Sequence, residues 1–138
     1  AIALHNLPEG MVIGASYAAD LAEAGQDGRM MALVIGLHNI PEGMAVAVPL
    51  AAGGASRGRA VLTTAAAGAP TVLGAVLGFC LGTMGPGLQM LTLGGASGAM
   101  LYVVFGELLP ESFRLCRSPA PVMAAVLGVL TGMGVVLG

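Results

Sequence analysis

Two nearly identical eight-residue segments contain the side chains best suited to bind a metal ion. The segment LHNLPEGM covers residues 4–11, and LHNIPEGM covers residues 37–44. Each places a histidine and a glutamate four residues apart, His5 with Glu9 and His38 with Glu42. Residues at this spacing lie on one face of a helix. Imidazole and carboxylate groups together are ligands of divalent cations, so the duplication predicts two facing helices that share one metal site.

The charge of the two glutamates supports this interpretation. Both lie in strongly apolar surroundings, where an ionised side chain is expensive. The chain has no lysine, and no arginine lies within an apolar stretch to pair with them. A bound dication would supply the missing positive charge. Two alternatives remain: a proton relay made of histidine and glutamate without metal, or histidines that only form hydrogen bonds within the packed helices.

In each motif a proline lies three residues after the histidine. A proline inside a helix removes one backbone hydrogen bond, so Pro8 would free the carbonyl of Leu4 and Pro41 that of Leu37. We therefore expect both helices to be kinked or broken beside the metal site. Such breaks are tolerated at membrane depth where they line a cavity, and transporters use them at their substrate sites.

Three further polar residues are candidates for the same chemistry. Asn6 and Asn39 directly follow the histidines, about 100° further around each helix. Each is either an oxygen ligand of the metal or a hydrogen-bond partner of a neighbouring helix. Glu107 is the acidic residue of the fourth apolar stretch. It is either a relay carboxylate where the ion leaves or an interfacial acid in contact with water.

The composition indicates an integral membrane protein. Of the 138 residues, 57% are apolar and only 9% are charged, whereas a soluble domain has about 25% charged residues. A membrane-crossing helix needs about 20 apolar residues. We predict an all-α, polytopic transmembrane helix bundle that forms a single domain over residues 1–138. The expected spans cover about residues 1–19, 30–53, 60–83, 88–109 and 122–138.

The arginines predict the orientation of these spans. The second and fourth links each contain two arginines, which places them in the cytoplasm and the C-terminus outside. Because the first motif begins so early, we expect the chain to be a fragment whose upstream helices are missing. Gly74, Gly78 and Gly82 form a ladder at four-residue spacing. This ladder predicts close helix packing within the chain or, alternatively, a homodimer face.

At the paired motifs the chain resembles the ZIP (Zrt/Irt-like) family of divalent-metal transporters. The two motifs are similar to the family's fourth and fifth helices, in the form common in its bacterial branch. GELLPES at residues 106–112 is similar to the end of the seventh helix. The resemblance therefore covers helices four to eight of eight. It implies a plasma (inner) membrane transporter that moves Zn²⁺, or Fe²⁺, Mn²⁺ or Cd²⁺, into the cytoplasm.

The resemblance also implies a set of metal ligands. They carry over to His5, Asn6, Glu9, His38, Asn39 and Glu42, with Glu107 as an additional ligand on the inner side. One departure concerns the sixth helix, where the bacterial branch usually has a glutamate before a proline. Ala69 stands at that position here. We therefore expect one bound metal, or a weak second one.

Other functions are less well supported. An intramembrane zinc protease would show HExxH, and a di-iron carboxylate protein would show ExxH; neither motif occurs here. We expect no enzymatic activity and no organic cofactor. The alternative is an intramembrane sensor or metalloenzyme with a static metal. Expected partners are the divalent ion, the lipid bilayer and the missing N-terminal helices. Nucleic-acid binding is not expected, because there is no basic patch.

Overall fold

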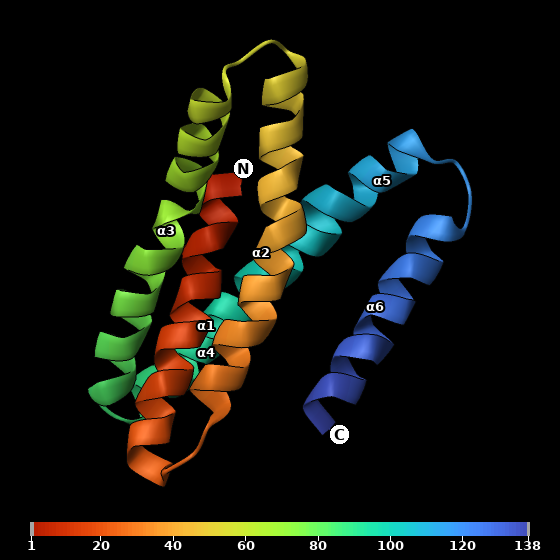
Figure 1. Cartoon of the computed structure of the whole chain (residues 1–138). Helices are drawn as coiled ribbons and strands as arrows, with labels where there is room; N and C mark the ends of the chain where they lie inside the picture. Colours follow the sequence, from red (N-terminus) through yellow and green to blue (C-terminus); the bar gives the residue numbers. More distant parts are fainter. Residues whose placement is uncertain (1, 138) are drawn as a thin grey trace. The chain divides into compact units, whose positions relative to one another are not determined.

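Helices account for nearly all of the chain (Figure 1). The structure, a computed structural model, describes residues 2–137 and the side chains of residues 5–134 and 137. The helices are α1 (Ile2–Glu23), α2 (Asp27–Ala52), α3 (Arg57–Thr83), α4 (Pro86–Val103), the π-helical turn η1 (Val104–Leu108), α5 (Leu109–Leu115) and α6 (Ala120–Leu137). No strand occurs within residues 2–137. The predicted all-α class is confirmed.

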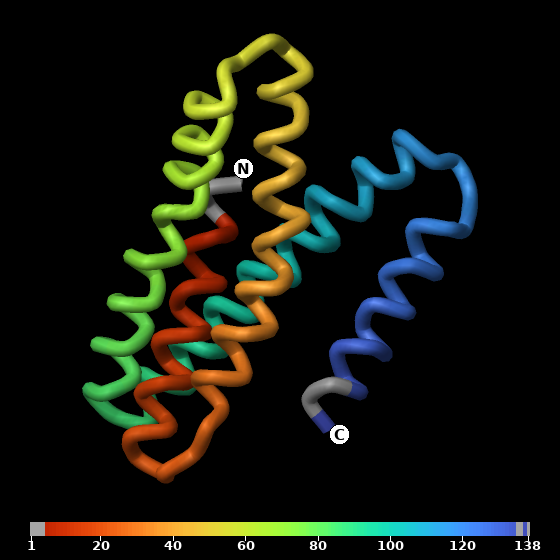
Figure 2. Tube along the Cα trace, viewed as in Figure 1, coloured from red at the N-terminus to blue at the C-terminus, as the bar shows by residue number. Residues whose placement is uncertain are grey.

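The chain forms two compact units, residues 1–100 and 101–138. In the first unit, α1 packs against both α2 and α3, and α2 also contacts α3. Figure 2 shows these three helices running side by side. In the second unit, η1 continues directly into α5, which contacts α6.

Glycines bring α1 and α3 into direct backbone contact. A Cβ atom added at Gly74 or Gly78 would overlap the carbonyl oxygens of Leu7 and Met11, respectively. In the opposite direction, a Cβ atom at Gly10 would overlap the carbonyl oxygen of Thr71. The glycine ladder therefore serves close packing within the chain, which is the first of its two predicted uses. Backbones that approach this closely gain dispersion contacts along the whole interface.

The buried apolar core is small. It consists of Val12, Ile35 and Ala96, surrounded by partly buried side chains of α1, α2 and α4. Many large apolar side chains, such as Leu62 and Leu130, are exposed. This surface suits a lipid environment. Three described stretches are long and apolar enough to cross a membrane: Asp27–Ala52, Arg57–Thr83 and Pro86–Leu115. The division of the chain into five spans stays a prediction.

The carboxylate of Asp20 connects α1 to the first turn of α2. Its two oxygens accept hydrogen bonds from the backbone N–H groups of Asp27 and Gly28, each at 2.9 Å. These N–H groups belong to the first turn of α2 and have no partner within that helix. Gly28 is buried against Tyr17 of α1, where a Cβ atom would lie 2.7 Å from the ring. Together these contacts hold the end of α1 beside the start of α2.

Replacing Asp20 with alanine is expected to destabilise the α1–α2 connection. The loss of a capping side chain costs about 0.5–2 kcal/mol. Thermal unfolding of the purified protein in detergent, compared with a Glu23→Ala variant, measures the effect. Glu23 is an exposed acid of the same link, so it controls for the loss of charge. Equal melting temperatures for the two variants would contradict the capping role.

Candidate metal site

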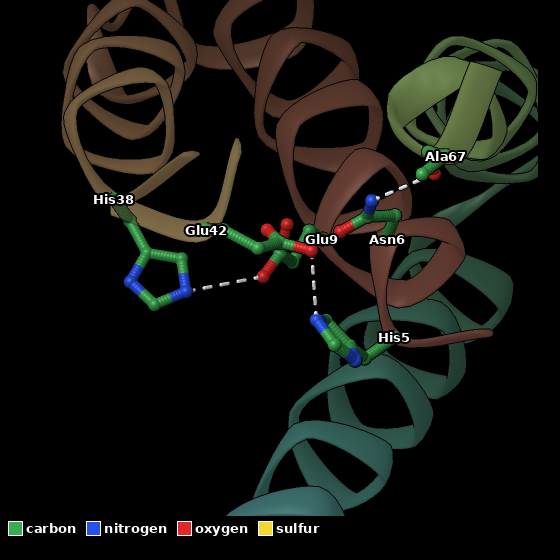
Figure 3. A network of polar contacts seen from close by, with 6 residues as sticks. All are labelled: His5, Asn6, Glu9, His38, Glu42 and Ala67. Atoms are coloured by element: carbon green, nitrogen blue, oxygen red, sulfur yellow. Dashed lines mark hydrogen bonds and ion pairs between the residues drawn. The ribbon is translucent and has the colours of Figure 1, made fainter. Parts of the chain in front are cut away.

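The two repeated motifs meet face to face and exchange partners. Nε2 of His5 on α1 lies 2.9 Å from Oε1 of Glu42 on α2. In the reverse direction, Nε2 of His38 on α2 lies 3.5 Å from Oε1 of Glu9 on α1. Figure 3 shows both pairs converging between the two helices. The predicted pairing of two facing helices is therefore present, and each histidine pairs with the glutamate of the other helix.

Three of these side chains form a tight cluster. One ligand atom from each of His5, Glu9 and Glu42 lies within 4.8 Å of the other two. Glu9 is buried, whereas the side chains of His5 and Glu42 are partly buried. His38 lies at the edge of the cluster, with 62% of its side chain exposed. The cluster offers three potential ligands, and His38 is a fourth beside them.

Among the described residues, no arginine pairs with the carboxylate of Glu9 or of Glu42. The arginine ion pair of the described residues lies elsewhere and joins Arg114 to Glu111. Two carboxylates this close repel each other in a poorly solvated site. A cation between them would replace this repulsion by attraction. The electrostatics of the described residues therefore favour a bound cation.

The two asparagines have different contacts, although they occupy equivalent positions in the repeat. The amide nitrogen of Asn39, assigned to face the two carboxylates, donates to Oε2 of Glu9 (3.1 Å) and Oε2 of Glu42 (3.2 Å). The opposite amide orientation would direct an oxygen at two other oxygens. Asn39 therefore bridges the two acids of the cluster.

Asn6 faces α3 instead. Its amide nitrogen donates to the carbonyl oxygen of Ala67 at 3.0 Å, and the residue is only 3% exposed. Its Oδ1 atom has no protein partner. Of the two predicted roles, Asn6 thus has the interhelical hydrogen bond, and its oxygen remains available to a ligand. The role of either asparagine as a metal ligand stays a prediction.

The expected breaks at the two motif prolines are absent. α1 continues through Pro8, and α2 continues through Pro41. The expectation of a break was therefore wrong, whereas a kink within each continuous helix stays a prediction. A proline removes a single hydrogen bond, and the remaining bonds on either side keep each helix continuous. Gly10, two residues after Pro8, packs against the backbone of α3.

Glu107 lies in the π-helical turn η1 and is exposed. It belongs to the unit formed by residues 101–138, whereas the other six predicted residues belong to residues 1–100. Short π-helical segments within helices are frequent at functional sites. The role of Glu107 stays a prediction.

A small cavity beside the cluster includes residues of α3 that the sequence analysis did not identify. It has a volume of about 100 Å³. Its lining consists of Asn6, Asn39, Glu42, Gly43, Val46, Thr64, Ala67 and Gly68. Thr64 is a polar residue in an apolar helix, which is the signal that could have identified it. Ala69 is exposed and does not belong to this lining.

Comparison with known proteins supports the same conclusion as the paired motifs. The sequence profile of the ZIP zinc transporter family matches residues 1–138. The chain is 43% identical over 114 residues to the zinc transporter GufA of Myxococcus xanthus, covering 83% of this chain and 44% of that protein. It is 38% identical over 137 residues to the zinc transporter ZIPB of Bordetella bronchiseptica, covering 99% of this chain and 42% of that protein. No solved structure shows a significant match.

The chain thus spans less than half the length of these two relatives. The match covers both motifs and all of the described helices. This family match and the three apolar helical stretches long enough to cross a bilayer identify an integral membrane protein. This chain belongs to the ZIP zinc transporter family.

Proposed function

We propose that the protein moves divalent metal cations across the membrane into the cytoplasm, with Zn²⁺ as the first candidate and Fe²⁺, Mn²⁺ and Cd²⁺ as related substrates. The observation that carries this proposal is the crossed arrangement of His5 with Glu42 and His38 with Glu9. It joins nitrogen and oxygen ligands from two helices in an otherwise apolar protein. The relatives named as zinc transporters support the same substrate class.

In this proposal the ion binds between α1 and α2. His5, Glu9 and Glu42 are its central ligands, since their ligand atoms already lie within 4.8 Å of one another. His38 is the fourth protein ligand, and Asn6 and Asn39 complete the polar surroundings. Glu107 receives the ion as it leaves toward the cytoplasm. Relative motion of helix groups around the site would alternate access between the two sides.

The arginines and the relatives support a proposal for the orientation and surroundings of the site. The links that contain Arg57, Arg59, Arg114 and Arg117 lie in the cytoplasm, and the C-terminus lies outside. The membrane is the plasma (inner) membrane. Further helices of the same protein, corresponding to the remaining length of the relatives, complete the bundle around α1–α3.

Uptake of radiolabelled zinc by proteoliposomes tests the transport function. We expect zinc to accumulate inside vesicles that contain the intact protein and not inside protein-free vesicles. Competition by iron, manganese and cadmium then ranks the substrates. Zinc binding to the protein without accumulation would instead support the alternative of a static metal in a sensor or metalloenzyme.

Zinc binding is expected to weaken as the pH falls. Imidazole and carboxylate ligands must be deprotonated to bind a metal, so protons compete with zinc for His5, Glu9 and Glu42. The apparent dissociation constant should therefore rise between about pH 8 and about pH 5. Equilibrium zinc titration of the detergent-purified protein at fixed ionic strength measures it. A dissociation constant that is flat over this range would contradict binding by these residues.

A further inference from the structure

The cavity beside the metal cluster is large enough for water. Its volume of about 100 Å³ corresponds to about three water molecules at the volume of liquid water. Residues of α1, α2 and α3 line it, and Glu42 is common to the cavity and to the cluster. A water molecule in this cavity would therefore lie next to the bound ion.

Asn6, which lines the cavity, has a buried acceptor without a donor. Asn6 is 3% exposed, and its Oδ1 atom has no protein partner. Figure 3 shows this oxygen on the side of Glu9 and the amide nitrogen on the side of Ala67. The hydroxyl of Thr64, which also lines the cavity, already donates to the carbonyl oxygen of Ala60 at 2.9 Å. Buried polar atoms are almost always hydrogen-bonded, so this oxygen calls for a donor that the described residues do not supply.

The protein ligands leave coordination positions free. The cluster offers three ligands, and His38 lies at its edge. A tetrahedral Zn²⁺ takes four ligands, and ions such as Mn²⁺ prefer octahedral coordination by oxygen. A water molecule bound to a cation directs both hydrogens away from it. Glu42, which belongs to both the cavity lining and the cluster, has carboxylate oxygens that can accept such a hydrogen, and a small shift of Asn6 would bring its unpartnered oxygen into reach of the other.

We propose that this cavity is a hydration pocket, which holds water still bound to the transported ion. The inference rests on the proposed function and deepens it. The site accepts a partly hydrated cation rather than a fully dehydrated one. Its substrates therefore include octahedral ions such as Mn²⁺ and Fe²⁺ as well as Zn²⁺. Water, and not a second metal ion, occupies the cavity next to the bound ion.

Gly68 is the position at which the proposed pocket can be altered. It lines the cavity, and a Cβ atom added there would meet nothing within 4 Å. A side chain at this position therefore meets no backbone obstacle. Replacing Gly68 with valine would fill part of the space and exclude water. Gly94 on α4 gives a control, because it too is helical and has no neighbour within 4 Å of an added Cβ atom; it is exposed, whereas Gly68 is partly buried.

Electron paramagnetic resonance of bound Mn²⁺ tests the proposal directly. The intact protein and its Gly68→Val and Gly94→Val variants are loaded with Mn²⁺ in D₂O. Deuterium modulation counts the water ligands, and nitrogen couplings report histidine ligation. We expect at least one water ligand in the parent and in Gly94→Val, and fewer in Gly68→Val. Uptake by the Gly68→Val variant should also shift in favour of Zn²⁺ over Mn²⁺.

The possible failures can be told apart. Histidine-bound Mn²⁺ without any water ligand, or with the same water count in Gly68→Val, would overturn the hydration pocket and leave the proposed function intact. Two Mn²⁺ ions per chain with mutual magnetic coupling would also overturn it, because the cavity would then hold a metal. If the parent protein bound no Mn²⁺ that shows nitrogen coupling to histidine, both the proposed binding site and this inference would be overturned.

Discussion

Replacing Glu42 with alanine is expected to reduce zinc uptake to the level of protein-free vesicles. Glu42 is the residue on which most contacts of the site depend. It lies 2.9 Å from Nε2 of His5, accepts a hydrogen bond from Asn39, and belongs to the three-ligand cluster. Loss of a partner that only orients a metal ligand already costs about 10- to 100-fold in affinity. Loss of a ligand itself should therefore weaken zinc binding by more than about 100-fold.

Two further variants separate the loss of a ligand from general damage. Glu42→Gln preserves the size of the side chain and an oxygen acceptor for Asn39 but removes the negative charge. It should fold normally and still bind zinc poorly. Glu111→Ala removes an exposed acid whose ion pair with Arg114 lies outside the site, and it should transport like the parent. Normal zinc uptake by Glu42→Ala would contradict the proposed site.

Replacing Gly78 with valine is expected to prevent stable packing of α1 on α3. A Cβ atom at Gly78 would lie 2.7 Å from Cα of Met11 and would overlap its carbonyl oxygen. Because the obstacle is backbone, no side-chain rotation can relieve it, and the two helices must separate. Overpacking of this kind costs about 1–3 kcal/mol or more. Since α1 contributes His5 and Glu9, the variant should lose metal binding along with stability.

Thermal unfolding in detergent, followed by size-exclusion chromatography, measures this effect. Gly94→Val is the matched control, because the same substitution there meets nothing within 4 Å. It should lose little or no stability, because valine has a higher intrinsic helix propensity than glycine. If Gly78→Val melted at the same temperature as Gly94→Val, the close contact between α1 and α3 would not contribute to stability as described.

Much of the site could be predicted from the spacing of residues alone. A separation of four residues puts His5 and Glu9 on one helical face, and the repeat does the same for His38 and Glu42. The absence of lysine and of nearby arginines already indicated a positively charged ligand. The glycine ladder of α3 indicated a close helix contact, and the structure shows α1 as its partner.

The continuity of α1 and α2 through their prolines could not be predicted from these rules. A proline weakens a helix locally, but packing decides whether the helix yields. Gly10 and Gly14 hold α1 against the backbone of α3 on the C-terminal side of Pro8. This contact leaves little freedom for α1 to bend away. The local sequence thus predicted, as one of two outcomes, a break that does not occur.

The sequence by itself determined that this protein is an all-helical member of a membrane transporter family and which side chains are candidates for binding an ion. These properties depend on composition and on short-range spacing, which local helix geometry converts directly into one polar face. Only the tertiary structure decided that His5 pairs with Glu42, that Asn6 and Asn39 take different partners, and that α3 lines a cavity with Thr64 and Gly68. Such contacts depend on the register and separation of helices far apart in the chain. Asp20, Gly28 and the glycines of α1 and α3 set that register through contacts that no single helix contains.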